Sequence, residues 1–364
     1  MRLQAGRRWR DFWGLEDFVH PYSWHLLELL PKPPDAVITH NLHGGYFDLR
    51  ALPEIASKVP ILSVLHDYWM LTGHCAFPLG CERWKQDCGN CPHLEIPPRI
   101  RRDSTRTNIR RKAEIYGKTP LTVSCPSRFV LDDVQKSVLA RECSDSILHI
   151  PNGVDLELFH PGDQTQARGR LGLPKETSLI LMIGNDLERN PFKDYACARG
   201  TAKCLAEEGR VATFVVLGGK GTYGAWEVGD IRFHPIPFVI DRNTVADYFR
   251  ACDVLLHCTR AETAPLVISE ALASGLPPIV SDAGNAVELV GDAGFVLPQG
   301  DAAAHAAALS RVLDDPELRA ELQRRARRQA EASGGVDRML DSFERWLLDH
   351  VPSAACDGPH GGAS

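Results

Sequence analysis

Short apolar runs rich in β-branched residues alternate along the chain with longer segments of helical period. The runs lie at residues 35–40, 60–66, 121–125, 178–184, 211–219, 253–258 and 277–282. Runs of this length and composition predict buried strands, and the periodic segments between them predict helices. An alternation of strands and helices indicates parallel sheets flanked by helices. The sequence therefore predicts an α/β fold.

A cluster of Pro, Asn and Gly interrupts the alternation at residues 149–163, HIPNGVDLELFHPGD. Such a cluster is typical of a domain boundary, and 364 residues are enough for two cores. We predict two doubly wound domains, residues 1–150 and 151–335, that face a cleft, and a disordered tail at 351–364. In such sheets ligands bind beyond the carboxyl ends of the strands, so the residues directly after each strand are the candidates for a site.

Composition and charge exclude several classes of protein. A formal net charge of −6 disfavours a nucleic-acid-binding surface, and no apolar run reaches the roughly 18 residues that cross a bilayer. The chain starts without the apolar stretch of a secretory signal, and its eleven cysteines, an odd number, suit a reducing compartment. We therefore expect a cytoplasmic protein. The basic run at 99–112, with Arg7, Arg8 and Trp9, is either a solvated helix face or a peripheral contact with an anionic membrane.

Two glutamates, Glu262 and Glu270, lie on either side of the start of a predicted apolar helix. Pro265 is expected in the first turn of this helix, and Gly275 ends it. The free N–H groups and the positive end of the helix dipole suit a phosphate. The two carboxylates, about 12 Å apart if both were helical, suit the hydroxyl groups of the substituents on either side of a pyrophosphate.

This pattern predicts a site for a nucleoside-diphosphate sugar. The alternative is a helix cap at Glu262 and a solvent-facing acid at Glu270. That alternative is weaker because Val267, Ile268 and the residues that follow leave the helix little polar face.

Several motifs in order resemble one enzyme family. The Glu–x7–Glu spacing followed by ALASGLPPIVSDAGNAVELV resembles the donor-site signature of the retaining glycosyltransferases of family 4, the glycosyl transferases group 1 of the GT-B fold. IPNGVDLELFHP is similar to the connection between the domains of that family, and SLILMIGNDLERNPFKDY to its phosphate-binding strand and loop. HNLHGGYFDLRALPEI and residues 65–94 resemble a subgroup from bacterial polysaccharide gene clusters. The resemblance covers about residues 14–347 and implies two Rossmann-like domains.

The resemblance also implies roles for single residues. Glu270 matches the carboxylate that binds the ribose, and Glu262 the one that faces the donor hexose. Lys193 and Arg189 match the basic pair that neutralises the diphosphate without a metal ion, and His66 the cleft histidine near the reacting carbon. Further donor contacts are expected at Gly184, Thr263, Ala264, Pro265, Leu266 and Val267. The chain departs from many relatives in having Asn after Gly184 and in having Ala264 and Pro265 where they have an aromatic residue and Gly.

The implied activity is transfer of a hexose from a nucleoside diphosphate to a saccharide or lipid-linked acceptor, with retention and without a protein nucleophile. A role in cell-surface polysaccharide biosynthesis and a final helix, 336–350, that crosses back onto the first domain are also implied. The family opens with a strand and a glycine-rich turn ahead of anything like residues 14–18, so the first domain is expected to be incomplete. We favour a true start that lies upstream. The alternative is a non-catalytic relative that binds sugar nucleotides or a partner, which the missing segment supports and the intact donor motif opposes.

Four cysteines lie close together in a turn-rich loop, residues 74–93. Cys75, Cys81, Cys88 and Cys91 have the spacing C-x5-C-x6-C-x2-C, with His74 and His93 adjacent. Four thiolates suit tetrahedral zinc, while disulfides or reduced structural cysteines are the alternatives. We predict a structural zinc ion with no catalytic role, because four thiolates leave no open position on the metal.

The segment GKGTYG at 219–224 fits the dinucleotide-binding pattern G-x-G-x-x-G. That pattern must open a helix, whereas AWEVGDIRFHPI leads into another strand. We therefore predict a loop over the donor cleft and not a site for a dinucleotide cofactor.

Overall fold

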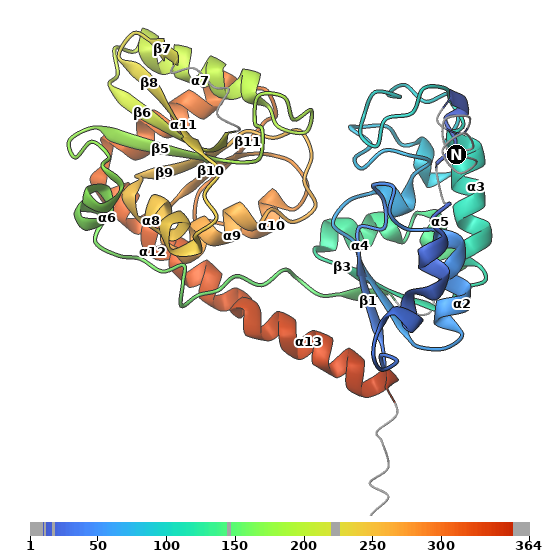
Figure 1. The fold of residues 1–364 in the computed structure, drawn as a ribbon. Coiled ribbons are helices and arrows are strands. Elements are labelled where there is room, and N and C mark those ends of the chain that lie inside the picture. Colours follow the sequence, from blue (N-terminus) through green and yellow to red (C-terminus); the bar gives the residue numbers. More distant parts are fainter. Residues whose placement is uncertain (1–9, 11, 17–18, 144–146, 220–225, 352–364) are drawn as a thin grey trace, which may run out of the picture.

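The computed structural model describes residues 10, 12–16, 19–143, 147–219 and 226–351. Figure 1 shows two α/β domains joined by an extended connection and by a long final helix. The predicted α/β architecture with two Rossmann-like domains is confirmed. The predictions for Arg7, Arg8 and Trp9, for the loop at 219–224 beyond Gly219, and for the tail after Val351 fall outside the described residues.

The first domain has a parallel sheet of four strands in the order β1-β2-β3-β4. Its strands are β1 (Val37–His40), β2 (Ile61–Val64), β3 (Leu121–Cys125) and β4 (Ile147–His149). Its helices are η1 (Pro21–Leu29), η2 (Leu49–Ala51), α2 (Leu52–Ala56), η3 (Trp69–Leu71), η4 (Arg83–Lys85), α3 (Thr105–Tyr116), α4 (Arg128–Val134) and α5 (Val138–Glu142). The side chains of β2 and β3 are buried throughout, as expected for strands covered on both faces.

The second domain has a sheet of seven strands in the order β11-β10-β9-β5-β6-β8-β7, parallel except for the pair β7 and β8. Its strands are β5 (Ser178–Ile183), β6 (Ala212–Gly219), β7 (Trp226–Val228), β8 (Ile231–Pro237), β9 (Val254–His257), β10 (Pro278–Ser281) and β11 (Phe295–Leu297). Its helices are α6 (Gln164–Leu171), α7 (Tyr195–Glu207), α8 (Arg242–Ala251), α9 (Leu266–Ala273), α10 (Ala286–Val290), α11 (Ala302–Asp314) and α12 (Pro316–Ser333). Two separate clusters of buried apolar side chains form its core.

The predicted strands are present, with boundaries that differ by a few residues. The sequence did not predict β4, β7 and β11, because each has three residues and no distinctive apolar run. The expected place of Pro265 was wrong by one residue: α9 begins at Leu266, and Pro265 is its N-cap, with an extended ψ of 113°.

The last helix, α13 (Gly335–His350), runs from the second domain to beneath the first (Figure 1). The amide of Val336 donates to the carbonyl of Val154, 2.9 Å away, which holds the start of α13 against the connection. A Cβ at Gly153 would lie 2.4 Å from the Cα of Val336, so only glycine allows this close approach. Among the described residues, no helix is long and apolar enough to span a bilayer.

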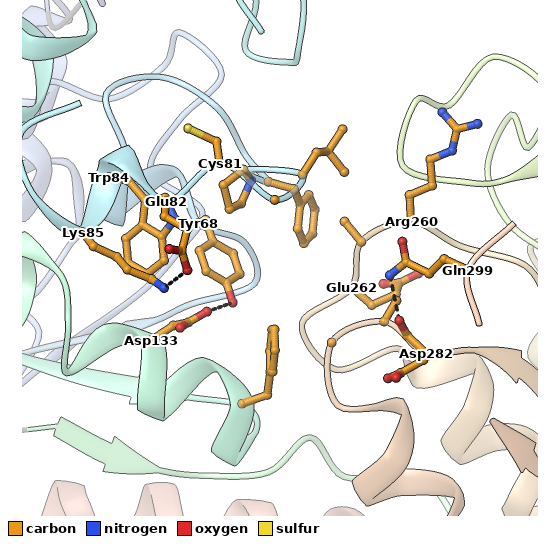
Figure 2. A pocket seen from close by; sticks show the side chains of 18 residues that line it. Tyr68, Cys81, Glu82, Trp84, Lys85, Asp133, Arg260, Glu262, Asp282 and Gln299 are labelled. Atoms are coloured by element: carbon orange, nitrogen blue, oxygen red, sulfur yellow. Dashed lines mark hydrogen bonds and ion pairs between the residues drawn. The ribbon is translucent and has the colours of Figure 1, made fainter. Parts of the chain in front are cut away.

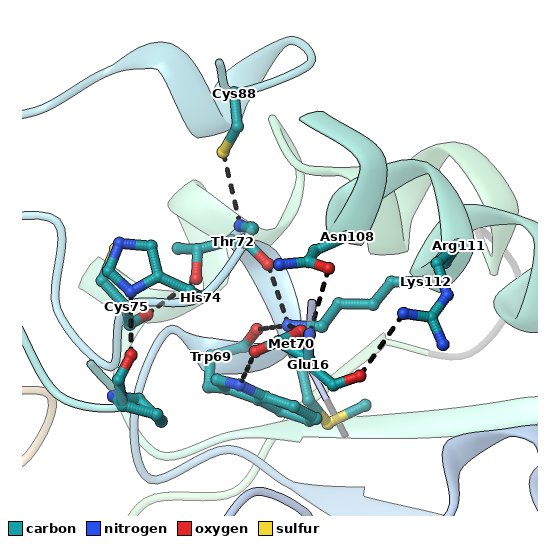
Figure 3. Close-up of polar contacts among 12 residues, drawn as sticks. Glu16, Trp69, Met70, Thr72, His74, Cys75, Cys88, Asn108, Arg111 and Lys112 are labelled. Atoms are coloured by element: carbon teal, nitrogen blue, oxygen red, sulfur yellow. Dashed lines mark hydrogen bonds and ion pairs between the residues drawn. The ribbon is translucent and has the colours of Figure 1, made fainter. Parts of the chain in front are cut away.

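A buried ion pair anchors the base of the cysteine-containing loop in the first domain (Figure 3). Lys112 of α3 is fully buried, and its Nζ lies 2.9 Å from a carboxylate oxygen of Glu16. The same Nζ donates to the carbonyls of Trp69, at 2.7 Å, and Thr72, at 2.9 Å. The indole N–H of Trp69 donates to the other oxygen of Glu16. The residues just before the cysteine-containing loop (residues 74–93) are therefore held by buried hydrogen bonds, which are strong because water is excluded from them.

Candidate active site

Glu262 lies in the loop that follows β9 and is held by two basic side chains. Lys193 Nζ and His257 Nε2 both contact its Oε1, His257 at 3.1 Å. Burial would raise the pKa of Glu262, but the hydrogen bond from His257 and the charge of Lys193 hold it at about 2. Burial lowers the pKa of His257, so a neutral imidazole donates its Nε2 proton. Glu262 is therefore a fixed, ionised acceptor at the end of the sheet.

Glu270 lies on α9, the helix that follows the loop of Glu262. Burial raises the pKa of Glu270 to about 7, although the charge of Arg242 acts to lower it. A carboxyl group with this pKa is partly protonated near neutral pH and gains from hydrogen-bond donors that a ligand would bring. The two predicted glutamates thus differ in protonation: Glu262 is ionised beside Lys193 and His257, whereas burial raises the pKa of Glu270.

The first domain meets α9 through backbone and hydroxyl groups. The Thr263 hydroxyl donates to the carbonyl of His66 at 2.9 Å, and the Ser127 hydroxyl donates to the carbonyl of Thr263 at 3.0 Å. The side-chain amide of Asn152 donates to the carbonyl of Ala264 at 3.2 Å. The loops after β2 and β9 are therefore joined directly, and His66 lies beside the start of α9.

The His66 imidazole is stacked on that of His40. His40 Nδ1 and His66 Nε2 lie 2.8 Å apart, and the ring centroids are separated by 5.1 Å. Burial and the neighbouring His40 lower the pKa of His66, so the ring is neutral at pH 7. Asp67 accepts from the amide of Trp69 at 2.9 Å and contacts His43 Nε2 at 2.6 Å. These contacts fix the loop after β2.

A cavity of about 330 Å³ opens between the two domains (Figure 2). One wall comes from the loops after β9, β10 and β11, and includes Arg260, Glu262 and Asp282. The other comes from the cysteine-containing loop and α4 of the first domain. Of the residues predicted for donor binding and catalysis, only Glu262 lines this cavity.

The other predicted residues of the second domain lie on the loop after β5 and at the start of α9. Gly184 follows β5, and an added Cβ there would lie 2.5 Å from Leu187 and 3.8 Å from Lys193 Cε. Arg189 is exposed on the loop between β5 and α7. Pro265 and Leu266 open α9, with Thr263 and Ala264 before them and Val267 in its first turn.

Sequence reasoning missed His257 and Arg260. His257 is the last residue of β9, and the guanidinium of Arg260 lies 3.4 Å from Asp194 at the start of α7. Their position at and just after a strand end is the signal that would have identified them.

The four cysteines of the loop surround one small space in the first domain. Cys75, Cys81, Cys88 and Cys91 line a cavity of about 20 Å³ together with His74. His74 Nε2 lies 3.4 Å from Cys91 Sγ, and Cys88 Sγ accepts from the amide of Gly73 at 3.3 Å. In the described part of the chain, only Cys197, Cys258 and His305 place three ligand atoms within 4.8 Å of one another. The zinc site therefore stays a prediction.

The two facing domains and the cleft between them have the GT-B fold. Sucrose-phosphate synthase from Thermosynechococcus elongatus has a similar structure, with a TM-score of 0.65 at 17% identity over 90% of this chain and 76% of that one. Anabaena HepE in complex with UDP-glucose gives a TM-score of 0.60 at 17% identity over 86% of this chain and 78% of that one. At these identities the likeness shows the fold.

Sequence comparison matches part of the chain to one family. Residues 163–329, most of the second domain, match the model of the glycosyl transferases group 1. The chain is 26% identical to the colanic acid biosynthesis glycosyl transferase WcaC of Escherichia coli K12 over 70% of its length, and 31% identical to a D-inositol 3-phosphate glycosyltransferase of Acidothermus cellulolyticus over 50%. It spans 62% and 43% of these two relatives. The comparisons support a glycosyltransferase of this group.

Proposed function

We propose that this chain transfers a hexose from a nucleoside-diphosphate sugar to a saccharide or lipid-linked acceptor, with retention of configuration. The main evidence for the proposal is that Glu262, which precedes α9, contacts both Lys193 and His257. The next residue, Thr263, donates a hydrogen bond to the carbonyl of His66. A carboxylate for sugar hydroxyls and a cation for phosphate lie at the end of a helix whose dipole favours anions. The Anabaena HepE complexes with UDP and UDP-glucose have the same fold, which supports a nucleotide-sugar donor.

In the proposed reaction the bond between the anomeric carbon and the diphosphate oxygen breaks, and the acceptor oxygen bonds to that carbon on the same face. The acceptor proton leaves with the nucleoside diphosphate, so the reaction needs no protein nucleophile. Lys193, Arg189 and the start of α9 would stabilise the negative charge on the leaving group without a metal ion. Lys193 is bound to Glu262 in the structure, so the diphosphate would compete with Glu262 for this cation.

We place Glu262 toward the transferred hexose and Glu270 toward the ribose. Gly184 and the segment from Thr263 to Val267 would supply the close approach of backbone to phosphate. The likeness to WcaC, whose name refers to colanic acid biosynthesis, supports a role in cell-surface polysaccharide biosynthesis. The same role would place the enzyme in the cytoplasm, with a peripheral contact to the inner face of the membrane.

The test is calorimetric titration of the full chain with UDP, GDP and their sugars. We expect one of these bases to bind, and Glu270→Gln to lower its affinity by roughly one to two powers of ten through the loss of charge-assisted hydrogen bonds. Glu262→Gln should reduce transfer more than nucleotide binding, because contacts to the reacting sugar matter most in the transition state. Unchanged nucleotide binding in both variants would show that Glu262 and Glu270 do not form the donor site. A parent chain that binds none of the panel would favour the non-catalytic alternative.

A further inference from the structure

A second cavity, of about 590 Å³, lies in the second domain, at the opposite end of α9 from the loop of Glu262. Its lining comes from Pro161 and Gly162 of the connection between the domains, from α8, from the end of α9 and from α12. These elements lie where the connection leaves the second domain (Figure 1). A volume of this size is typical of sites for small molecules. The residues of the proposed donor site do not line this space.

Among the described residues that line this cavity, the charged ones are all arginines: Arg250, Arg324, Arg327 and Arg328. Two of them are fixed by backbone carbonyls. Nη2 of Arg250 donates to the carbonyl of Leu158 at 2.6 Å, and Nη1 of Arg327 donates to the carbonyl of Ala273 at 2.9 Å. The other two are on the exposed side of α12, with side chains 64% and 69% exposed. Guanidinium groups are the usual partners of phosphate oxygens in proteins.

The carboxylate of Glu321 does not neutralise the arginines around it. Three guanidinium groups approach this carboxylate, Arg324 at 2.6 Å, Arg325 at 2.8 Å and Arg328 at 3.7 Å. The contact of Arg328 is longer than a hydrogen bond. Arg328 therefore keeps hydrogen-bond donors that a ligand could use.

The other ion pairs leave the same excess of positive charge. They are Arg170 with Asp247 at 2.7 Å, Arg250 with Asp247 at 3.1 Å, Arg327 with Glu331 at 2.6 Å and Arg325 with Asp292 at 3.4 Å. Together with Glu321, four carboxylates are thus shared by six arginines. The surroundings of the cavity therefore stay positive after pairing, which favours an anion.

A buried hydroxyl in the same lining lacks a hydrogen-bond partner. Ser274 directly follows α9 and is 6% exposed, and its Oγ is unpaired within the described part of the chain. An unpaired buried hydroxyl costs free energy, which an acceptor oxygen of a ligand could recover. Ser274 lies next to α12, because Arg327 donates to the carbonyl of the preceding residue. The last three carbonyls of α9 already accept hydrogen bonds, so this helix end presents no unpaired acceptor to an anion.

Apolar side chains complete the lining. Pro161, Phe249 and Leu276 contribute to it, and they offer contacts to carbon atoms and not to charged oxygens. A free inorganic ion would leave these contacts unused. An organic molecule that carries a phosphate group would use both parts of the lining.

We propose that this cavity is a binding site for a small, soluble phosphate monoester. Arg324 and Arg328 supply the charge at the exposed side, and the hydroxyl of Ser274 supplies a hydrogen bond. The inference goes beyond the proposed function and does not rest on it, because the two sites have no residue in common. A ligand here would also contact the connection between the domains at Pro161 and Gly162.

The test is calorimetric titration of the full chain with inorganic phosphate, glycerol 3-phosphate and glucose 6-phosphate at constant ionic strength. We expect the two monoesters to bind more tightly than inorganic phosphate. The double variant Arg324→Gln with Arg328→Gln should weaken monoester binding roughly tenfold and leave the affinity for UDP or GDP unchanged. The matched control is Arg232→Gln with Arg345→Gln, which removes two exposed arginines outside the cavity and should change neither affinity.

Two further variants separate this cavity from the donor site. Ser274→Ala should weaken monoester binding roughly threefold without lowering the midpoint of thermal unfolding, because its hydroxyl has no partner to lose in the described chain. Lys193→Gln should weaken nucleotide binding and keep monoester binding.

Three results would overturn the inference. The first is no binding of either monoester at millimolar concentration. The second is monoester binding that is lost in Lys193→Gln and unchanged in the double arginine variant, which would place the phosphate in the donor site. The third is binding of vesicles that contain phosphatidic acid without binding of any soluble monoester, which would assign the arginines to a lipid surface. Failure of nucleotide binding alone would contradict only the proposed function.

Discussion

The hydroxyl of Thr263 donates a hydrogen bond to the carbonyl oxygen of His66, 2.9 Å away, and so joins the loop after β9 to the loop after β2. The carbonyl of Thr263 accepts in turn from Ser127 at 3.0 Å. One residue thus uses both its side chain and its backbone to fix the start of α9 against the first domain. The distance between His66 and the proposed donor site depends on this contact.

We predict that Thr263→Val, which keeps the shape and removes the hydroxyl, lowers the free energy of unfolding by about 1 kcal/mol. Transfer should fall more than nucleotide affinity, because the variant loosens His66 relative to the donor. Urea unfolding and kinetic assays on the same preparation measure both effects. Thr263→Ser keeps the donor and is the control; equal behaviour of the two variants would show that the hydrogen bond has no role in positioning.

The pKa of Glu270 predicts how nucleotide binding depends on pH. Burial raises this pKa from its ordinary value of 4.5 to about 7, and a ribose would bind the ionised form. Affinity for UDP or GDP should therefore rise by roughly tenfold between pH 6 and pH 8. Calorimetry at pH 6, 7 and 8 measures this rise. The variant Glu270→Gln should flatten the profile, and an equally steep profile in that variant would assign the titration to another group.

The same raised pKa has a consequence for stability. The folded chain holds the Glu270 proton more tightly than the unfolded chain, so stability from this group is fully present below pH 4.5 and is lost as the pH rises through about 7. Glu270→Gln should therefore be more stable relative to the parent at pH 8 than at pH 5. Thermal unfolding at the two pH values measures the difference, and a constant offset would contradict the assigned burial.

Lys193 and Glu262 should show strong coupling in a double-mutant cycle. Their side chains are 16% and 14% exposed, so Lys193→Met leaves a poorly solvated carboxylate with His257 as its neighbour and should cost about 3 kcal/mol. The double variant with Glu262→Gln should recover part of this loss. Lys58 and Glu54, a surface pair with side chains 50% exposed, are the matched control and should show little coupling. Additive effects at Lys193 and Glu262 would mean that the two charges do not stabilise each other.

Metal analysis tests the zinc prediction for Cys75, Cys81, Cys88 and Cys91. We expect one zinc ion per chain, lost in a Cys88→Ser and Cys91→Ser double variant, with a lower midpoint of thermal unfolding. Cys252→Ser, a buried cysteine of the second domain, should keep the metal. Metal-free protein with four titratable thiols under native conditions would leave only a packing role for the loop.

The order of elements and the position of the donor glutamates could be predicted from the sequence. Glu262 lies in the loop after the apolar run that forms β9, and Glu270 lies on α9, which ends just before Gly275. The pattern of neighbouring residues was therefore enough to predict this strand, loop and helix. The short strands β4, β7 and β11 could not be predicted, because three residues have too little pattern and gain their stability from neighbouring strands. That Pro265 caps α9, and does not lie inside it, was likewise settled by the packed backbone.

The sequence by itself determined which residues follow each strand, because the hydrophobic period and the turn residues are local properties of the chain. Only the tertiary structure decided what those residues meet. Lys193 and Glu262 are far apart in the sequence, and so are Phe129 and Asp282, which line the same cavity from different domains. The pair of Lys193 and Glu262 forms within the second domain, where the loops after β5 and β9 lie side by side, and the burial that shifts the pKa of Glu270 arises from packing around α9. The approach of Phe129 to Asp282 depends on how the two domains pack together. Their packing depends on contacts between surfaces, such as those between Thr263 and His66 and between Phe77 and Phe192, for which the sequence has no periodic signal.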